Sequence, residues 1–88
     1  FALSQLLKSP EPAYLLAPQC PASAAWWSRE EQPTRQAQLL LELVDELSAC
    51  LAIDRQRLYL IGVSMGGHGV WDLGWRYPGR WAALVPIC

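Results

Sequence analysis

The fold of this chain is decided by residues 58–67, which read Leu-Tyr-Leu-Ile-Gly-Val-Ser-Met-Gly-Gly. The apolar run predicts a strand and the residues after it predict a helix, so Ser64 would lie in the tight turn between them. Such a turn leaves no room for side chains two positions before and after the serine, where Gly62 and Gly66 stand. It lifts the serine hydroxyl above the edge of the sheet, where a base and hydrogen-bond donors can reach it. The sequence therefore predicts a nucleophile elbow with Ser64 at its tip.

Around this turn, apolar runs alternate with amphipathic segments. The patterns predict the end of a helix within 1–9, strands over 13–17, 58–63 and 81–87, and helices over 34–51 and 66–77. Residues 13–17 are continuously apolar, which is typical of a strand buried on both faces, and residues 18–33 form a loop. Thr34 is expected to cap the helix that follows this loop. The alternation predicts an α/β fold with parallel strands and helices on both faces of the sheet.

Length and charge limit the classes of partner. The chain has 88 residues, which is enough for one small domain at most, and 52% of them are hydrophobic, which is typical of globular material. The formal net charge is −1, and the seven basic residues are scattered among eight acidic ones. No basic stripe is present to attract nucleic acid or an anionic membrane, and no apolar run approaches the roughly 20 residues of a spanning helix. We therefore expect neither nucleic acid nor a membrane as a partner, while the compartment and the oligomeric state stay open.

The sequence shows no pattern of a metal or cofactor site. Cys20, Cys50 and Cys88 are an odd number of cysteines at long, irregular spacings, without a Cys-x-x-Cys pair. We expect buried or half-buried thiols, and a disulfide between Cys20 and Cys88 stays open. The glycine-rich residues 62–69 lack the lysine of a phosphate-binding loop. No metal and no organic cofactor is therefore predicted.

The chain resembles the α/β-hydrolase superfamily, and within it the serine esterases and predicted peptidases similar to bacterial feruloyl esterases and polyhydroxybutyrate depolymerases. The residues that carry the resemblance lie in six stretches: 17–21, 26–27, 54–67, 71–73, 76–78 and 82–88. The resemblance implies that Ser64 is the nucleophile, that the backbone N–H of Met65 is one oxyanion donor, and that Gly62 and Gly66 are structural glycines of the elbow. It also implies a partial hydrolase fold, whose three strands correspond to the fourth, fifth and sixth of the family's eight.

By the same resemblance, residues 1–88 are expected to form a single incomplete domain, an internal fragment of a longer hydrolase. The family's acid and histidine follow the serine on later strands, and its second oxyanion donor comes from a loop upstream. The family's third strand lies between the fourth and fifth, so a gap is expected between the strands 13–17 and 58–63. The parent protein is expected to hydrolyse a small-molecule ester, and the fragment alone to be inactive. A serine peptidase of the same fold and a non-catalytic binding module are the alternatives.

Two polar residues near the elbow are expected to have roles other than catalysis. His68 is the only histidine of the chain and stands four residues after Ser64. In the first turn of the helix it would point along the helix and away from the hydroxyl, so we expect a packing or surface residue rather than the base. Asp72 is expected to pair with Arg76 one turn later rather than to serve as the triad acid.

Two roles are open for Trp26 and Trp27, and one position is expected for Trp71 and Trp75. Trp26 and Trp27 follow the first strand, on the side where parallel sheets place ligands, and would either line the acyl or alcohol pocket or pack under the loop. Trp71 and Trp75 lie four residues apart on one helix face and are expected in the core.

The acidic residues outside the elbow are expected to be solvated: Glu30, Glu31, Glu42, Asp45 and Glu46.

Overall fold

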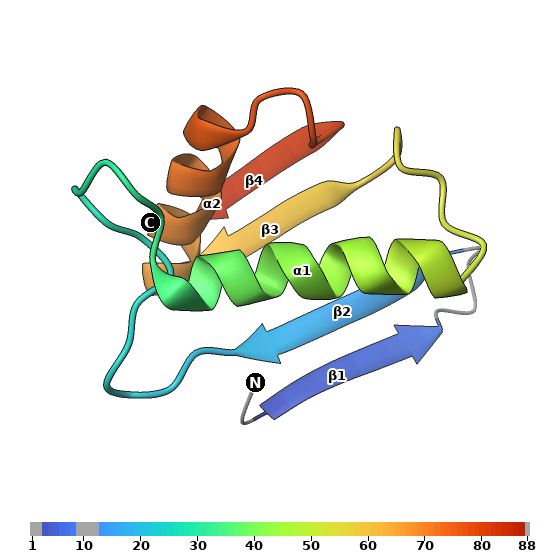
Figure 1. Cartoon of the computed structure of the whole chain (residues 1–88), viewed down its shortest axis with the longest axis horizontal. Helices are drawn as coiled ribbons and strands as arrows, with labels where there is room; N and C mark the ends of the chain where they lie inside the picture. The colour runs from blue at the N-terminus through green and yellow to red at the C-terminus, as the bar shows by residue number, and fades with distance from the viewer. Residues whose placement is uncertain (1–2, 9–12, 88) are drawn as a thin grey trace.

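The computed structural model describes residues 3–8 and 13–87 of the chain. Two strands come first, and then helices and strands alternate (Figure 1). The elements are β1 (Leu3–Lys8), β2 (Tyr14–Gln19), α1 (Arg35–Cys50), β3 (Tyr59–Val63), α2 (Met65–Arg76) and β4 (Ala83–Ile87). Cys88, and with it the open question of a disulfide to Cys20, lies outside the described residues.

The strands form two separate two-stranded sheets. β3 and β4 pair in parallel, with Tyr59 opposite Ala83 and Val63 opposite Ile87. β1 and β2 pair antiparallel, with Leu3 opposite Gln19. β2, β3 and β4 point the same way in Figure 1, but β2 has no hydrogen-bonded partner in β3. The structure thus confirms the α/β class, the parallel pair and the gap expected between the strands on either side of α1.

Residues 3–8 form a strand, and the prediction of a helix for them is wrong. The leucines at positions 3, 6 and 7 fit a helical spacing, but six residues are too few to separate that period from the alternation of a strand. The neighbouring apolar run decides between them, because Leu6 lies directly opposite Leu16 in the antiparallel pair. The rest of the expected helix, residues 1, 2 and 9, lies outside the described residues.

β2 is also less buried than its sequence predicts. Tyr14 and Leu15 are 40% and 54% exposed, and Leu16 is the apolar side chain of this strand that packs against the core. The reason is the missing pairing between β2 and β3, since a strand is buried on both faces only when it lies inside a covered sheet. Here β2 pairs with β1 alone.

The helix α1 carries the core of the described residues. Thr34 caps it as predicted, because its Oγ1 accepts a hydrogen bond from the N–H of Ala37 at 3.1 Å. Ala37, Leu40 and Leu41 are buried and lie on one face of the helix. They pack with buried side chains from the loop and from α2: Cys20, Trp26 and Leu73. Figure 1 shows α1 crossing in front of the space between β2 and β3.

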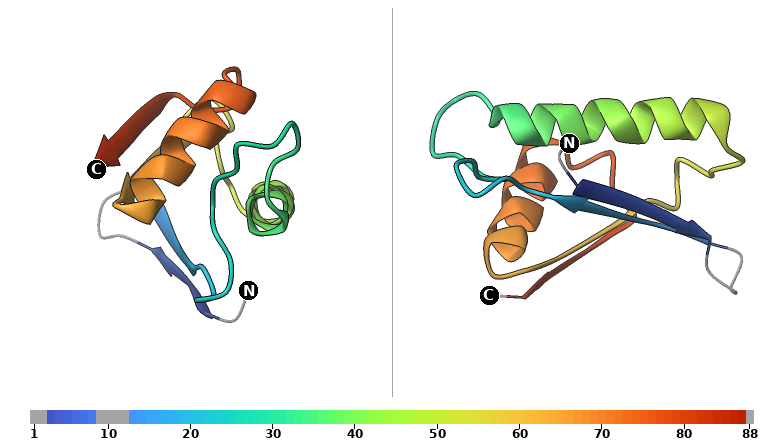
Figure 2. Two further views of the ribbon diagram at one scale, coloured as in Figure 1. Left: turned by 90° about the vertical axis from the view of Figure 1, so that its left-hand side faces the viewer. Right: turned by 90° about the horizontal axis from the view of Figure 1, so that it is seen from below.

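Both helices lie on the same side of β3 and β4, as the two views of Figure 2 show. Leu60 faces this side and packs against the core, and Leu84 meets α2 at Gly74. The side chains on the opposite side of the two strands are exposed: Ile61 and Val63 of β3 by 63% and 64%, and Val85 and Ile87 of β4 by 42% and 51%. The predicted helices on a second face are therefore not found among the described residues.

The prediction that Trp71 and Trp75 lie in the core is wrong, since they are 60% and 79% exposed. α2 instead turns its small residues toward the sheet and the loop. Its buried residues are Gly67, Gly69, Val70, Leu73 and Gly74. Glycines let the helix approach its neighbours closely, and the tryptophans fall on the other side of the helix. No helix among the described residues is long and apolar enough to cross a membrane.

Candidate active site

Ser64 lies at the sharp turn between the end of β3 and the start of α2. Its backbone has φ 58° and ψ −116°, and it is the one non-glycine residue with positive φ in the described part of the chain. Such a conformation costs about 1–3 kcal/mol and persists only where the surroundings impose it. Two hydrogen bonds impose it here: the N–H of Ser64 donates to the carbonyl of Ile87 at 2.7 Å, and its carbonyl accepts from the N–H of His68 at 3.1 Å. The residue is exposed and its hydroxyl does not cap the helix.

The two glycines that flank the turn are not equivalent. A Cβ at Gly62 would collide with the backbone carbonyl of Gly66, so no other residue fits there without moving the turn. A Cβ at Gly66 would meet nothing within 4 Å. The predicted lack of room is therefore found at Gly62 but not at Gly66, whose backbone is what fills the space beside Gly62.

Met65 is the first residue of α2. The first N–H groups of a helix have no acceptor inside the helix, and they carry its positive end. The N–H of Met65 follows the nucleophile directly, which is the position of an oxyanion donor in such elbows. Met65 therefore stays the candidate oxyanion donor expected from the sequence.

His68 turns its ring toward the loop after β2. The rings of His68 and Trp27 lie with their centroids 5.4 Å apart and an angle of 39° between their planes. The guanidinium of Arg29 stands 5.9 Å from the centre of the same Trp27 ring. These contacts agree with a packing role for His68, and they place Trp27 beside a residue that lies one helical turn after Ser64.

The two loop tryptophans therefore differ. Trp26 is 9% exposed and belongs to the core. Trp26 packs so closely on α2 that a Cβ added at Gly69 would lie 2.6 Å from the Cβ of Trp26. Trp27 is half-buried beside His68. Of the two pocket candidates, Trp27 is the one whose ring lies near the first turn of α2.

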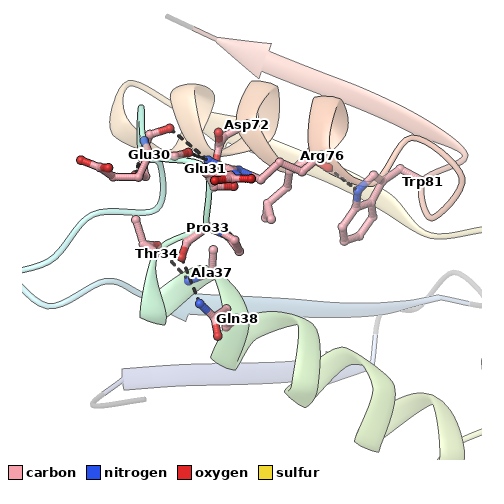
Figure 3. Close-up of polar contacts among 11 residues, drawn as sticks. Glu30, Glu31, Pro33, Thr34, Ala37, Gln38, Asp72, Arg76 and Trp81 are labelled. Carbon is pink, nitrogen blue, oxygen red and sulfur yellow. Dashed lines mark hydrogen bonds and ion pairs between the residues drawn. The ribbon is translucent and has the colours of Figure 1, made fainter.

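Arg76 at the end of α2 holds the same loop. Its Nε donates to Asp72 at 3.0 Å, which confirms the predicted pair, and its other nitrogens donate to carbonyls of the loop (Figure 3). Nη1 donates to Glu31 at 2.6 Å, and Nη2 donates to Ser28 at 3.3 Å and to Glu30 at 2.7 Å. Sequence reasoning missed these loop contacts, because the partners lie more than 40 residues apart and a backbone carbonyl leaves no trace in the sequence.

The acidic residues of the loop and of α1 are exposed, in agreement with their predicted solvation. Asp45 accepts hydrogen bonds from Arg80 at 2.8 Å and from Arg55 at 2.6 Å, and these bonds lower the pKa of its carboxyl. Burial raises the pKa of the Cys20 thiol, which suits an inert core residue. No group of three or more potential ligands that could hold a metal ion occurs among the described residues.

A shallow hollow of about 350 Å³ lies at the far end of α2. Its lining residues are Glu31, Gln32, Pro33, Trp75, Arg76 and Tyr77. The 12 residues of α2 separate it from Ser64 by roughly 18 Å at 1.5 Å per residue. The hollow therefore does not belong to the candidate site.

Comparison with known proteins points to one class of enzyme. No family model and no curated protein matches the chain. Among solved structures, the chain is similar to the crystal structure of a thermostable esterase, with a TM-score of 0.81 and 34% sequence identity over 88% of this chain. The chain spans 22% of the length of that esterase. These 88 residues are thus a partial α/β fold that is similar, in sequence and in structure, to one segment of an esterase.

Proposed function

We propose that these residues belong to a longer serine hydrolase that cleaves carboxylic esters through a covalent acyl-enzyme, with Ser64 as the nucleophile. The observation that carries the proposal is the backbone of Ser64, held at φ 58° between β3 and α2 with its side chain exposed. A strained, exposed serine at such a junction is costly for a fold that makes no use of it. The similarity to a thermostable esterase supports the same chemistry.

In the proposed reaction, Ser64 Oγ attacks the ester carbonyl and gives its proton to a base. The carbonyl oxygen becomes an oxyanion, and the N–H of Met65 together with the positive end of α2 stabilises it. The tetrahedral intermediate collapses, the C–O bond to the alcohol breaks, and the alcohol leaves with the proton from the base. Water then attacks the acyl-enzyme by the same route and releases the acid. The substrate is a small-molecule ester.

The base of this reaction is proposed to come from outside the 88 residues. His68 is the only histidine of the chain, and its ring lies against Trp27. Without a base and its orienting acid, triad enzymes lose about 10⁴-fold or more in rate. The 88 residues alone are therefore expected to be inactive, while the full-length protein is expected to turn over esters.

A fluorophosphonate probe tests the proposal on the full-length protein. The probe reacts with activated serines, so we expect one adduct, on the tryptic peptide 58–76 that contains Ser64. The Ser64→Ala variant should take up no probe. The control variant Ser23→Ala removes an exposed serine of the loop after β2 and should label like the wild type.

The outcomes separate the proposal from its alternatives. Labelling at Ser64 with turnover of p-nitrophenyl esters but not of p-nitroanilides supports the esterase. Faster turnover of the anilides would identify a peptidase instead. A folded full-length protein that shows neither labelling nor turnover would contradict the proposal and leave a binding module.

A further inference from the structure

The guanidinium of Arg76 is nearly fully enclosed by hydrogen-bond acceptors. Its side chain is 8% exposed, and each of its three nitrogens donates a hydrogen bond. One acceptor is the carboxylate of Asp72, on the same helix, and the other three are carbonyls of the loop at residues 28, 30 and 31. The planar fork of an arginine suits such a set of acceptors, whereas the single ammonium of a lysine does not.

Residues 28–31, which Arg76 holds, directly follow Trp27. Two contacts near the start of α2 also attach this loop to the helix: Trp26 packs on Gly69, and Trp27 lies against His68. Arg76 adds a third tie two turns further along the helix. The carbonyl of Ser64 accepts a hydrogen bond from the N–H of His68. The helix α2 therefore links the elbow, the Trp27 ring and the hydrogen bonds from Arg76 to the loop, which we call the Arg76 clamp.

We infer that Arg76 is a positioning residue of the ester site. By tying residues 28–31 to α2, it keeps the Trp27 ring beside His68, where that ring forms one wall of the substrate site next to Ser64. This inference rests on the proposed function. A loop freed from Arg76 would let Trp27 move away, and the substrate would lose a contact that the covalent chemistry at Ser64 does not need. The expected cost therefore falls on substrate binding.

Steady-state kinetics of the full-length protein test the inference. Arg76→Lys keeps the charge but loses the fork, so KM for a p-nitrophenyl ester should rise by about fivefold to tenfold while kcat changes by less than about twofold. Trp27→Ala should give the same pattern. The double variant should be no worse than the more affected single variant, because both changes remove the same wall. Arg80→Lys is the matched control, since Arg80 pairs with Asp45 and does not touch the loop, and it should leave KM unchanged.

Tryptic cleavage under native conditions tests the clamp without any need for activity. The bond after Arg29 lies inside the held segment, so Arg76→Lys should speed its cleavage several-fold. Cleavage after Arg57, in the exposed turn before β3, should stay unchanged. If Arg76→Lys fails to fold, Asp72→Asn offers a milder change, because it weakens one of the bonds that orient the guanidinium and should shift both measurements in the same direction.

Three results would overturn the inference. These are additive effects of Arg76→Lys and Trp27→Ala on KM, a fall in kcat with KM unchanged, and unchanged cleavage after Arg29. A full-length protein without esterase activity would contradict the proposed function, and tryptic cleavage would still decide whether Arg76 holds the loop.

Discussion

The two sheets differ in how closely they pack against the other described elements. Around β3, α2 and β4, the helix packs on both strands, and the elbow is bonded to the end of β4. The hairpin of β1 and β2 pairs with itself and joins the core through Leu16. The candidate site lies in the tightly held half. The comparison indicates that the elbow is imposed by close backbone contacts among neighbouring residues, while the hairpin makes few contacts with the other described elements.

The largest expected effect is at Gly62. Gly62→Ala places a methyl group against the backbone carbonyl of Gly66, and backbone cannot yield as a side chain does. The free energy of unfolding of the full-length protein should fall by roughly 3 kcal/mol, and probe labelling of Ser64 should be lost. Urea unfolding measures the first effect.

Gly66→Ala is the matched control, because its methyl group meets open space. It should change the free energy of unfolding by less than about 1 kcal/mol. Equal losses from the two substitutions would show that the elbow is not held by the contact between Gly62 and Gly66.

A smaller effect is expected where α2 meets β4. Gly74→Ala drives a methyl group into the side chain of Leu84, which can shift. The free energy of unfolding should fall by about 1–3 kcal/mol in thermal or urea denaturation. Leu84→Val in the same protein should restore part of this loss, because it removes the methyl groups that collide. A double variant less stable than Gly74→Ala alone would mean that the close packing of α2 on β4 is not the cause.

The ion pairs of Asp45 give a smaller, pH-dependent effect. They join α1 to the turns at Arg55 and Arg80, and they lower the pKa of the Asp45 carboxyl. Their stabilisation is therefore fully present above the ordinary aspartate pKa of about 3.9 and is lost as the pH falls through the lowered value. Because the carboxylate is half-exposed, the effect should stay below about 1 kcal/mol.

Asp45→Asn checks this by urea unfolding at about pH 6 and about pH 3. The wild type should be more stable than the variant near neutrality, and the difference should shrink in acid. A difference in stability that grows as the pH falls would contradict a lowered pKa for the Asp45 carboxyl.

The smallest effect is expected in the hairpin. Leu15 is 54% exposed, so Leu15→Ala should change the free energy of unfolding by less than about 0.5 kcal/mol. Urea unfolding of the full-length protein measures it, with Leu73→Ala, which is 1% exposed and should cost about 2–5 kcal/mol, as the reference for a buried leucine. A loss at Leu15 close to that at Leu73 would show that further chain covers β2, and that the hairpin is as firmly held as the elbow.

The elbow could be predicted from sequence because its causes are local: an apolar run, Gly62, and a helix start within a few residues. α1 was predictable for the same reason, through Thr34 and its apolar stripe. The buried face of α2 was not, because three glycines accompany Val70 and Leu73 on it, and the larger tryptophans at positions 71 and 75 then suggested a different face. The Arg76 clamp was hidden because its acceptors are backbone carbonyls of a distant loop.

The proposed reaction requires a covalent bond between Ser64 and the acyl group, and this intermediate can be trapped. The full-length protein is mixed with a p-nitrophenyl ester, quenched in acid during the first turnover, digested with trypsin and analysed by mass spectrometry. We expect p-nitrophenol to be released while an acyl group forms on Ser64 in peptide 58–76. Release of p-nitrophenol with the acyl group on another residue, or on none, would contradict the proposed reaction.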